Sequence, residues 1–195
     1  MKKWILPVLF LMAAGWISCQ SKKEEAAKNY ISVVSLIRNE VANIDTSLFT
    51  IVKTITYDST RVDTFYVSRE DFKNEARDFL DIPDLADKKV AKRYKDVSPI
   101  YDQALGRVIF KYEALDPEKE EVKSQEFLAT PVPGADAKIN NVIIIREISN
   151  RDSFLQKKML WRMNQSFQIV TSSQKPGQPE KTTVTKVTWN EDPYQ

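Results

Sequence analysis

Residues 154–172 constrain the fold more than any other segment, because their apolar and polar side chains alternate. The odd positions include Leu155, Met159, Trp161, Met163, Phe167 and Ile169, and the even positions include Gln156, Lys158, Arg162, Asn164, Ser166 and Gln168. Successive side chains of a β-strand point to opposite faces of a sheet, so this period of two predicts β structure with one buried face. Two strands joined by a tight turn would also fit, but no Gly or Pro marks a turn. We therefore expect a single long strand, bent near Asn164, in a curved sheet.

Strand patterns also lie on both sides of this segment. Alternation over residues 108–112 predicts one strand, and residues 122–130 and 141–148 predict two more. The segment NVIIIREI at 141–148 is the most apolar, and we expect it near the centre of the sheet with both faces covered. Residues 175–177, KPG, predict a turn before a last strand. One face of that last strand carries Thr183, Thr185, Val187 and Trp189.

The N-terminal part of the domain has helical spacing followed by a strand pattern. One helical stripe is formed by Tyr30, Val33, Val34, Ile37, Val41 and Ile44. Residues 43–47 are expected to end this helix. The β-branched residues of 48–67 predict a hairpin with its turn at Asp58-Ser59-Thr60.

Two further helices are predicted between the hairpin and the remaining strands. Ser68 and Asp71 resemble a capping box at the start of the first one. Its buried stripe is formed by Phe72, Ala76, Phe79 and Leu80. Pro83 ends this helix, and Asp84 is expected to cap a second one that runs to about Tyr94, followed by a loop over residues 96–99.

The predicted fold class is therefore α+β. The order is an N-terminal helix, a β-hairpin, two helices and then about five antiparallel strands, with the helices packed on one face of a curved sheet. The alternative is a cystatin-like or nuclear-transport-factor-like cone, in which the same parts enclose a pocket.

The first eighteen residues have the pattern of a secretion signal. Met1-Lys2-Lys3 is basic, and residues 4–14 form an apolar run that contains Pro7. That run is shorter than the roughly 20 residues that a membrane-spanning helix needs. Trp16-Ile17-Ser18 then precedes Cys19, the single cysteine of the chain. This segment resembles the lipobox of bacterial lipoproteins, and the whole pattern is similar to uncharacterised outer-membrane lipoproteins of Bacteroidota.

The resemblance implies a membrane anchor. Residues 1–18 would be removed, the thiol of Cys19 would carry diacylglycerol, and its new amino group would be acylated, because several acyl chains anchor a protein stably where one does not. Residues 19–27 are then a lipidated tether, and residues 28–195 form one α+β domain. Gln20 is not the residue that retains lipoproteins in the inner membrane, so the outer membrane is expected. Residues 22–25, KKEE, resemble a signal for the outer face, which favours the cell surface over the periplasmic side.

Composition excludes most familiar chemistry. The chain has no His, its one Cys is assigned to lipid, and it has four Gly. Imidazole bases, thiol nucleophiles, His or Cys metal sites and glycine-rich phosphate loops are therefore not expected. Residues 1–18 hold two Lys and no acid, so the remainder carries 27 residues of each charge, which does not favour nucleic acid. We predict no catalytic residues, no metal and no cofactor.

The charged clusters have simple structural interpretations. We expect Asp116, Glu118, Glu120 and Glu121 to form a solvated hairpin turn, since a calcium loop needs a Gly at its bend. Glu70 and Asp71 are expected to complement a helix dipole. Basic residues along the long strand either belong to a polar sheet face or bind an anion; these are Lys157, Lys158 and Arg162.

Two further features suggest sites. Met159, Trp161 and Met163 are expected either to pack in the core or to line an apolar ligand cavity. The segment Asp58-Ser59-Thr60 resembles a Bacteroidota O-glycosylation acceptor, which would place a glycan on Ser59.

These observations favour a non-catalytic, lipid-anchored envelope protein that binds a protein or glycan partner or supports an envelope assembly. The alternatives are a carrier or sensor of an apolar small molecule under the curved sheet, and an acid-dependent enzyme with two facing carboxylates.

Overall fold

A computed structural model describes residues 30–57 and 60–190 of the 195-residue chain. The predicted signal segment, the lipidation site Cys19, its tether and the glycosylation candidate Ser59 lie outside these residues. The described part contains four helices: α1 (Val33–Asp45), α2 (Arg69–Glu75), α3 (Arg77–Leu80) and α4 (Lys88–Ala91). None of the helices in this part is long and apolar enough to cross a membrane.

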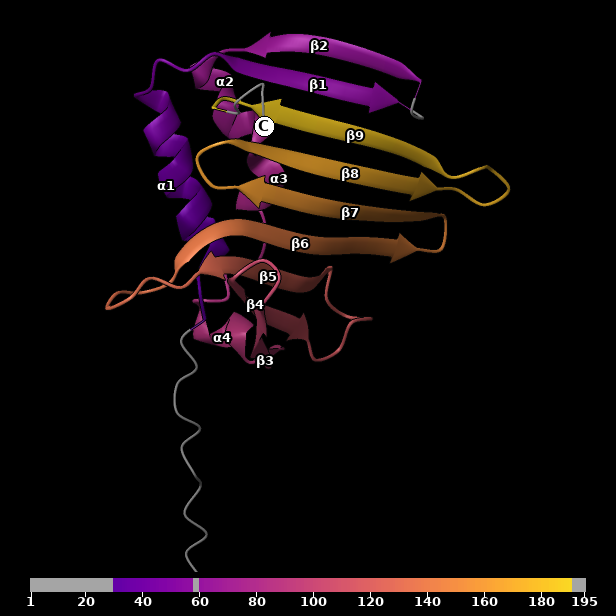
Figure 1. The fold of residues 1–195 in the computed structure, drawn as a ribbon. Helices are drawn as coiled ribbons and strands as arrows, with labels where there is room; N and C mark the ends of the chain where they lie inside the picture. Colours follow the sequence, from indigo (N-terminus) through magenta and orange to yellow (C-terminus); the bar gives the residue numbers. More distant parts are fainter. Residues whose placement is uncertain (1–29, 58–59, 191–195) are drawn as a thin grey trace, which may run out of the picture.

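Nine strands form a single antiparallel sheet in the order β2-β1-β9-β8-β7-β6-β5-β4-β3 (Figure 1). They are β1 (Ile51–Tyr57), β2 (Arg61–Val67), β3 (Tyr94–Asp102), β4 (Arg107–Ala114), β5 (Val122–Thr130), β6 (Lys138–Asn150), β7 (Ser153–Arg162), β8 (Ser166–Gln174) and β9 (Lys181–Thr188). Strands β3 to β9 follow one another as neighbours. The helices between β2 and β3 carry the chain from one edge of the sheet to the other.

The helices cover one part of one sheet face, as Figure 1 shows by the strands that extend past them on the right. The predicted stripe of α1 is buried from Tyr30 to Ile44. Ser68 caps α2 as predicted, since its Oγ accepts a hydrogen bond from the Asp71 N–H at 3.2 Å. The helix is interrupted at Ala76, where α2 ends and α3 begins, and Phe72 and Phe79 on the two pieces are both fully buried.

Aromatic side chains join the helices to the sheet. The ring of Phe79 lies 5.0 Å from that of Trp161, and Phe72 lies 5.2 Å from Trp189. Trp161 stacks on Phe167 of the neighbouring strand at 5.1 Å. Edge-to-face and stacked ring pairs of this kind stabilise a core beyond the area that they bury. The predicted α+β class, with helices on one face of an antiparallel sheet, is confirmed.

The prediction of one long strand over residues 154–172 is wrong, because β7 and β8 form a hairpin. Its turn contains Asn164 at φ 60°, the left-handed region that Asn tolerates better than most residues. In this register Trp161 lies opposite Phe167, and Met159 opposite Ile169, so odd-numbered residues pair with odd-numbered residues on the same face of the sheet. The alternation therefore continues through the turn without a break, which is why it resembles a single strand.

The predicted five-strand sheet is too small, and the predictions of a helix end at Tyr94 and a loop over residues 96–99 are wrong. The β1–β2 hairpin belongs to the same sheet because β1 pairs with β9. Residues predicted as the end of a helix and a loop form edge strand β3, in which Tyr94 lies opposite Ala114. Helix α4 is only four residues long, and Asp87 caps it in place of Asp84.

Strand β6 lies inside the sheet, as predicted, but only one of its faces is covered. Val142 and Ile144 are fully buried on the helix side, whereas Ile143 and Ile145 are half-buried on the other side. The apolar run predicts two covered faces, and that prediction is wrong. Here it leaves aliphatic side chains on a face without helices.

Candidate interaction surface

The residues predicted to line an apolar cavity lie in the packed core. Met159 and Trp161 are fully buried, and Met163 is half-buried in the turn that follows β7. The ring of Trp161 is enclosed by Phe79 at 5.0 Å, Phe167 at 5.1 Å, Trp189 at 5.4 Å and Phe72 at 6.3 Å. Core packing therefore accounts for Met159 and Trp161.

The three basic residues of β7 do not converge on one site. Lys157 faces the helices, where its Nζ lies 2.6 Å from Asp78 Oδ2 of α3. Lys158 and Arg162 point to the opposite face, because their positions differ from 157 by an odd number. Lys157 therefore joins a helix to the sheet, and an anion site made of all three residues is not formed.

The acidic residues that were singled out are held by cations or by a helix end. Glu70 and Asp71 lie in the first turn of α2, as predicted. In the β4–β5 loop, Asp116 Oδ2 lies 2.6 Å from Lys119 Nζ, and this hydrogen bond lowers the pKa of Asp116. Glu120 is only 9% exposed and receives two hydrogen bonds from Arg93 Nη1, so the turn is less solvated than predicted.

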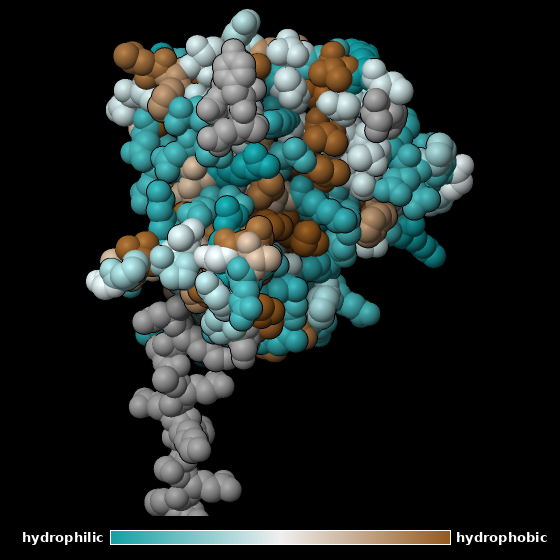
Figure 2. Space-filling view, in the orientation of Figure 1, coloured by the Kyte–Doolittle hydropathy of each residue, from teal (hydrophilic) through white to brown (hydrophobic). Residues whose placement is uncertain are grey.

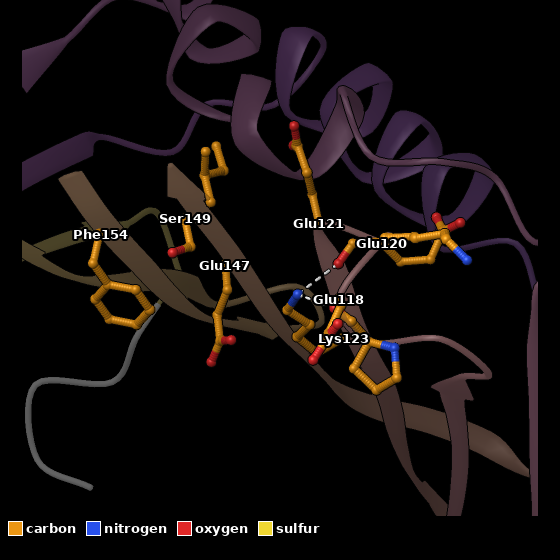
Figure 3. Close-up of a pocket in the computed structure, with 10 residues that line it drawn as sticks. Glu118, Glu120, Glu121, Lys123, Glu147, Ser149 and Phe154 are labelled. Atoms are coloured by element: carbon orange, nitrogen blue, oxygen red, sulfur yellow. Dashed lines mark hydrogen bonds between the residues drawn. The ribbon is translucent and has the colours of Figure 1, made fainter. Parts of the chain in front are cut away.

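An open hollow of about 700 Å³ lies between this loop and the β6–β7 end of the sheet (Figure 3). Glu121, on one wall, pairs with Arg146 at 2.6 Å, while Glu147 accepts a hydrogen bond from Gln156 at 2.7 Å. Lys123 Nζ donates to the backbone carbonyls of Glu120 and Pro117. These contacts fasten the loop to the sheet. Within the described residues no group of three or more acids could hold a metal ion.

The sheet surface away from α1–α3, which we call the open face, carries an aliphatic band whose members lie directly opposite one another on some strand pairs and diagonally on others. Its members are half-buried and belong to six neighbouring strands, β4 to β9; they are Ile109, Leu128, Ile143, Ile145, Leu160, Val170 and Val184. Ile109 lies opposite Leu128, and Ile143 lies opposite Leu160. Val170 continues the band to Val184 on β9. Figure 2 shows hydrophobic side chains running as a band between hydrophilic ones on this side of the molecule.

Charged residues border the aliphatic band. Lys111 and Lys95 both contact Glu113, at 2.8 Å and 3.2 Å, and these hydrogen bonds lower the pKa of Glu113. Lys158 lies within the band, because it is opposite both Ile145 on β6 and Val170 on β8. An apolar centre with a polar rim is the usual composition of a protein–protein interface.

Sequence reasoning missed this surface, although its signal is present. In β6 the odd positions are as aliphatic as the buried even ones, and in β7 Leu160 interrupts the polar even positions. The aliphatic side chains of residues 141–148 predict two covered faces, and no prediction was drawn from Leu160. Only the strand order places them next to one another.

Comparison of the chain with protein-family models, with curated proteins and with solved structures gives no match. The function is therefore argued from the residues and their geometry.

Proposed function

We propose that this chain is a non-catalytic, lipid-anchored protein of the bacterial outer membrane that binds a protein partner through its open face. The aliphatic band of that face is the observation that carries the proposal. Helices cover the opposite face, whereas no described element covers the band. The anchor rests on the lipobox-like segment that ends at Cys19.

The size and chemistry of the band favour a protein over a glycan. Six strands span five inter-strand spacings, or about 24 Å, which suits an interface of roughly 800 Å² on each partner. The seven members are all Val, Leu or Ile, whose burial is favourable but not directional. A glycan would instead require many hydrogen bonds to its hydroxyl groups.

The two alternative functions receive less support. A carrier of an apolar molecule would need space at Met159 and Trp161, where neighbouring rings fill the core. An acid-dependent enzyme would need two facing carboxylates in a cleft, but Glu120 and Glu121 beside the hollow are each paired with an arginine.

The lipid anchor is tested by the substitution Cys19→Ser. We expect the wild-type chain to incorporate a labelled fatty acid and to fractionate with outer membranes, and the variant to lose both properties. Protease treatment of intact cells then tests the facing: digestion supports surface display, and survival places the domain on the periplasmic side. Incorporation of label into the variant would contradict the assignment of Cys19.

The partner is tested by purifying two forms of the lipidated chain from envelope membranes, the wild type and the variant Leu160→Glu. This change places a charge in the centre of the aliphatic band, so we expect the co-purifying protein to be lost. Thr54→Glu is the matched control, because Thr54 is also half-buried on the open face but lies three strands away, on β1. A partner that survives Leu160→Glu, or a bound lipid or glycan without any protein, would contradict the proposal.

A further inference from the structure

The two edges of the sheet differ in how well they are protected. Edge strand β3 contains Pro99, and its pairing with β4 shifts register between Val97 and Ile100. Proline and irregular pairing are the usual means of preventing an edge strand from recruiting another strand. Edge strand β2 has neither: its seven residues pair with β1 without interruption, from Arg61 to Val67.

Strand β2 also exposes large apolar side chains on both of its faces. Tyr66 is 83% exposed and Val62 is 60% exposed on the open face, and Phe65 is 48% exposed on the helix side. Leu48, which precedes β1 in the same corner, is 95% exposed. A regular edge with exposed apolar residues favours association with another strand.

A hollow of about 290 Å³ lies at the end of β2. Its lining includes Leu48, Phe49, Tyr66, Val67 and Arg69. The Nε of Arg69 is shielded from solvent and has no hydrogen-bond partner among the described residues. A buried donor of this kind is costly unless an acceptor reaches it.

The β2 edge lies at the opposite side of the sheet from the residue at which the described domain begins. Tyr30, the first described residue, donates a hydrogen bond from its OH to the Tyr94 carbonyl of β3, and its ring lies 4.6 Å from that of Tyr112 in β4. Eight inter-strand spacings separate β3 from β2, which is about 38 Å. β2 is therefore the edge more distant from Tyr30; the partner's location in the envelope rests on the proposed function, in which Cys19 is the anchor.

We propose that β2 binds an extended segment of another envelope protein as a tenth, antiparallel strand. The exposed edge is one strand wide and about 23 Å long, which fits a segment of about seven residues but is small for a stable dimer of whole domains. Main-chain hydrogen bonds give such a contact its affinity, and alternate side chains give it specificity.

The geometry also specifies the sequence of the segment. Antiparallel pairing places its N-terminal residues beside the hollow and Arg69. The residues opposite Tyr66, Phe65 and Val62 occupy positions p, p+1 and p+4, and apolar side chains there bury the three exposed ones. Cross-strand pairs between aromatic and β-branched residues are favourable on either face.

The test places a photo-cross-linking amino acid at position 66 of the full-length chain in intact cells. Position 101 is the control, because Tyr101 is 58% exposed on the other edge strand. We expect position 66 alone to yield an adduct whose cross-linked peptide has the p, p+1, p+4 pattern. A capped synthetic peptide of that segment should then bind the purified protein, and Tyr66→Lys should weaken it at least tenfold while Tyr101→Lys does not.

The proposal would be overturned by an adduct between two copies of this chain, by the absence of any adduct specific to position 66, or by peptide binding that Tyr66→Lys leaves unchanged. N-methylation of alternate peptide amides should abolish binding, and persistence of binding would exclude strand addition. Leu160→Glu separates this inference from the proposed function, since it should leave peptide binding to β2 intact even if the open face binds nothing.

Discussion

A buried carboxylate on α1 fixes the turn between β7 and β8, and its removal gives a sharp test of the packing described above. Glu40 is only 6% exposed, and its Oε2 accepts a hydrogen bond from the backbone N–H of Asn164 at 2.6 Å. The two residues are 124 positions apart in the chain. Asn164 is also the one non-glycine residue with positive φ in the described part. The contact therefore joins helix α1 to the β7–β8 turn, which the alternation in the sequence does not predict.

The substitution Glu40→Ala removes this acceptor without disturbing the helix, because Ala has the highest helix propensity. A hydrogen bond to a charged group contributes about 1.5–3 kcal/mol to stability. Because Asn164 is exposed and its N–H is able to bind water in the variant, we expect Glu40→Ala to lower the free energy of unfolding by about 2 kcal/mol. Glu40→Gln keeps an acceptor of the same size without the charge, and we expect it to cost about 1 kcal/mol.

Urea unfolding measures both changes. With an m-value of about 2 kcal/mol/M, Glu40→Ala should lower the midpoint by about 1 M without changing the slope. Hydrogen exchange adds a local measurement, since the amide of Asn164 should lose protection in Glu40→Ala. The control is Asn164→Gly, which permits the same φ and retains the backbone donor, so Glu40→Ala should cost as much in that background. A cost below 0.5 kcal/mol, or unchanged exchange at Asn164, would refute the reasoning.

Two further predictions concern buried polar groups. Gln125 is fully buried, and its Oε1 has no hydrogen-bond partner among the described residues. Its Nε2 makes only a 3.5 Å contact with the Pro83 carbonyl. Gln125→Met should therefore raise the free energy of unfolding by about 1 kcal/mol in the same urea assay. Burial, with a smaller contribution from Glu120, raises the pKa of Tyr94 from 10.0 to about 12, which favours the neutral phenol in the folded state. The neutral phenol of Tyr94 contributes on the order of 2 kcal/mol to the free energy of unfolding; this contribution is complete below pH 10 and is lost as the pH rises to 12. In thermal unfolding measured across this pH range, Tyr94→Phe should not show the loss of stability at high pH.

The elements that were predicted well are those whose signals are local. The stripe from Tyr30 to Ile44 specifies a helix by spacing alone, and the hydroxyl of Ser68 marks the start of α2. The strand predicted at 122–130 has the bounds of β5. These signals depend on residues within one or two turns of one another, so tertiary packing does not alter them.

The errors arise where distant parts of the chain decide the structure. Tyr94 belongs to a strand because Ala114 lies opposite it and its OH donates to the Val122 carbonyl at 3.0 Å. The turn at Asn164 has no Gly or Pro, and the hairpin pairs odd-numbered residues with each other, so apolar and polar side chains alternate through the turn without a break. The residues near Tyr94 and Asn164 in the sequence predict neither feature.

The sequence by itself determined the alternation of faces, the helical stripes, the α+β class and the prediction of a lipid-anchored chain without histidine or thiol chemistry. Only the tertiary structure decided which surfaces remain available. Pairing of β1 with β9, more than 120 residues apart, makes β2 an edge, and the placement of α1–α3 on one face leaves the aliphatic band uncovered. Side-chain periodicity is set by neighbouring backbone geometry, whereas exposure of an edge or a face depends on what the rest of the chain packs against it.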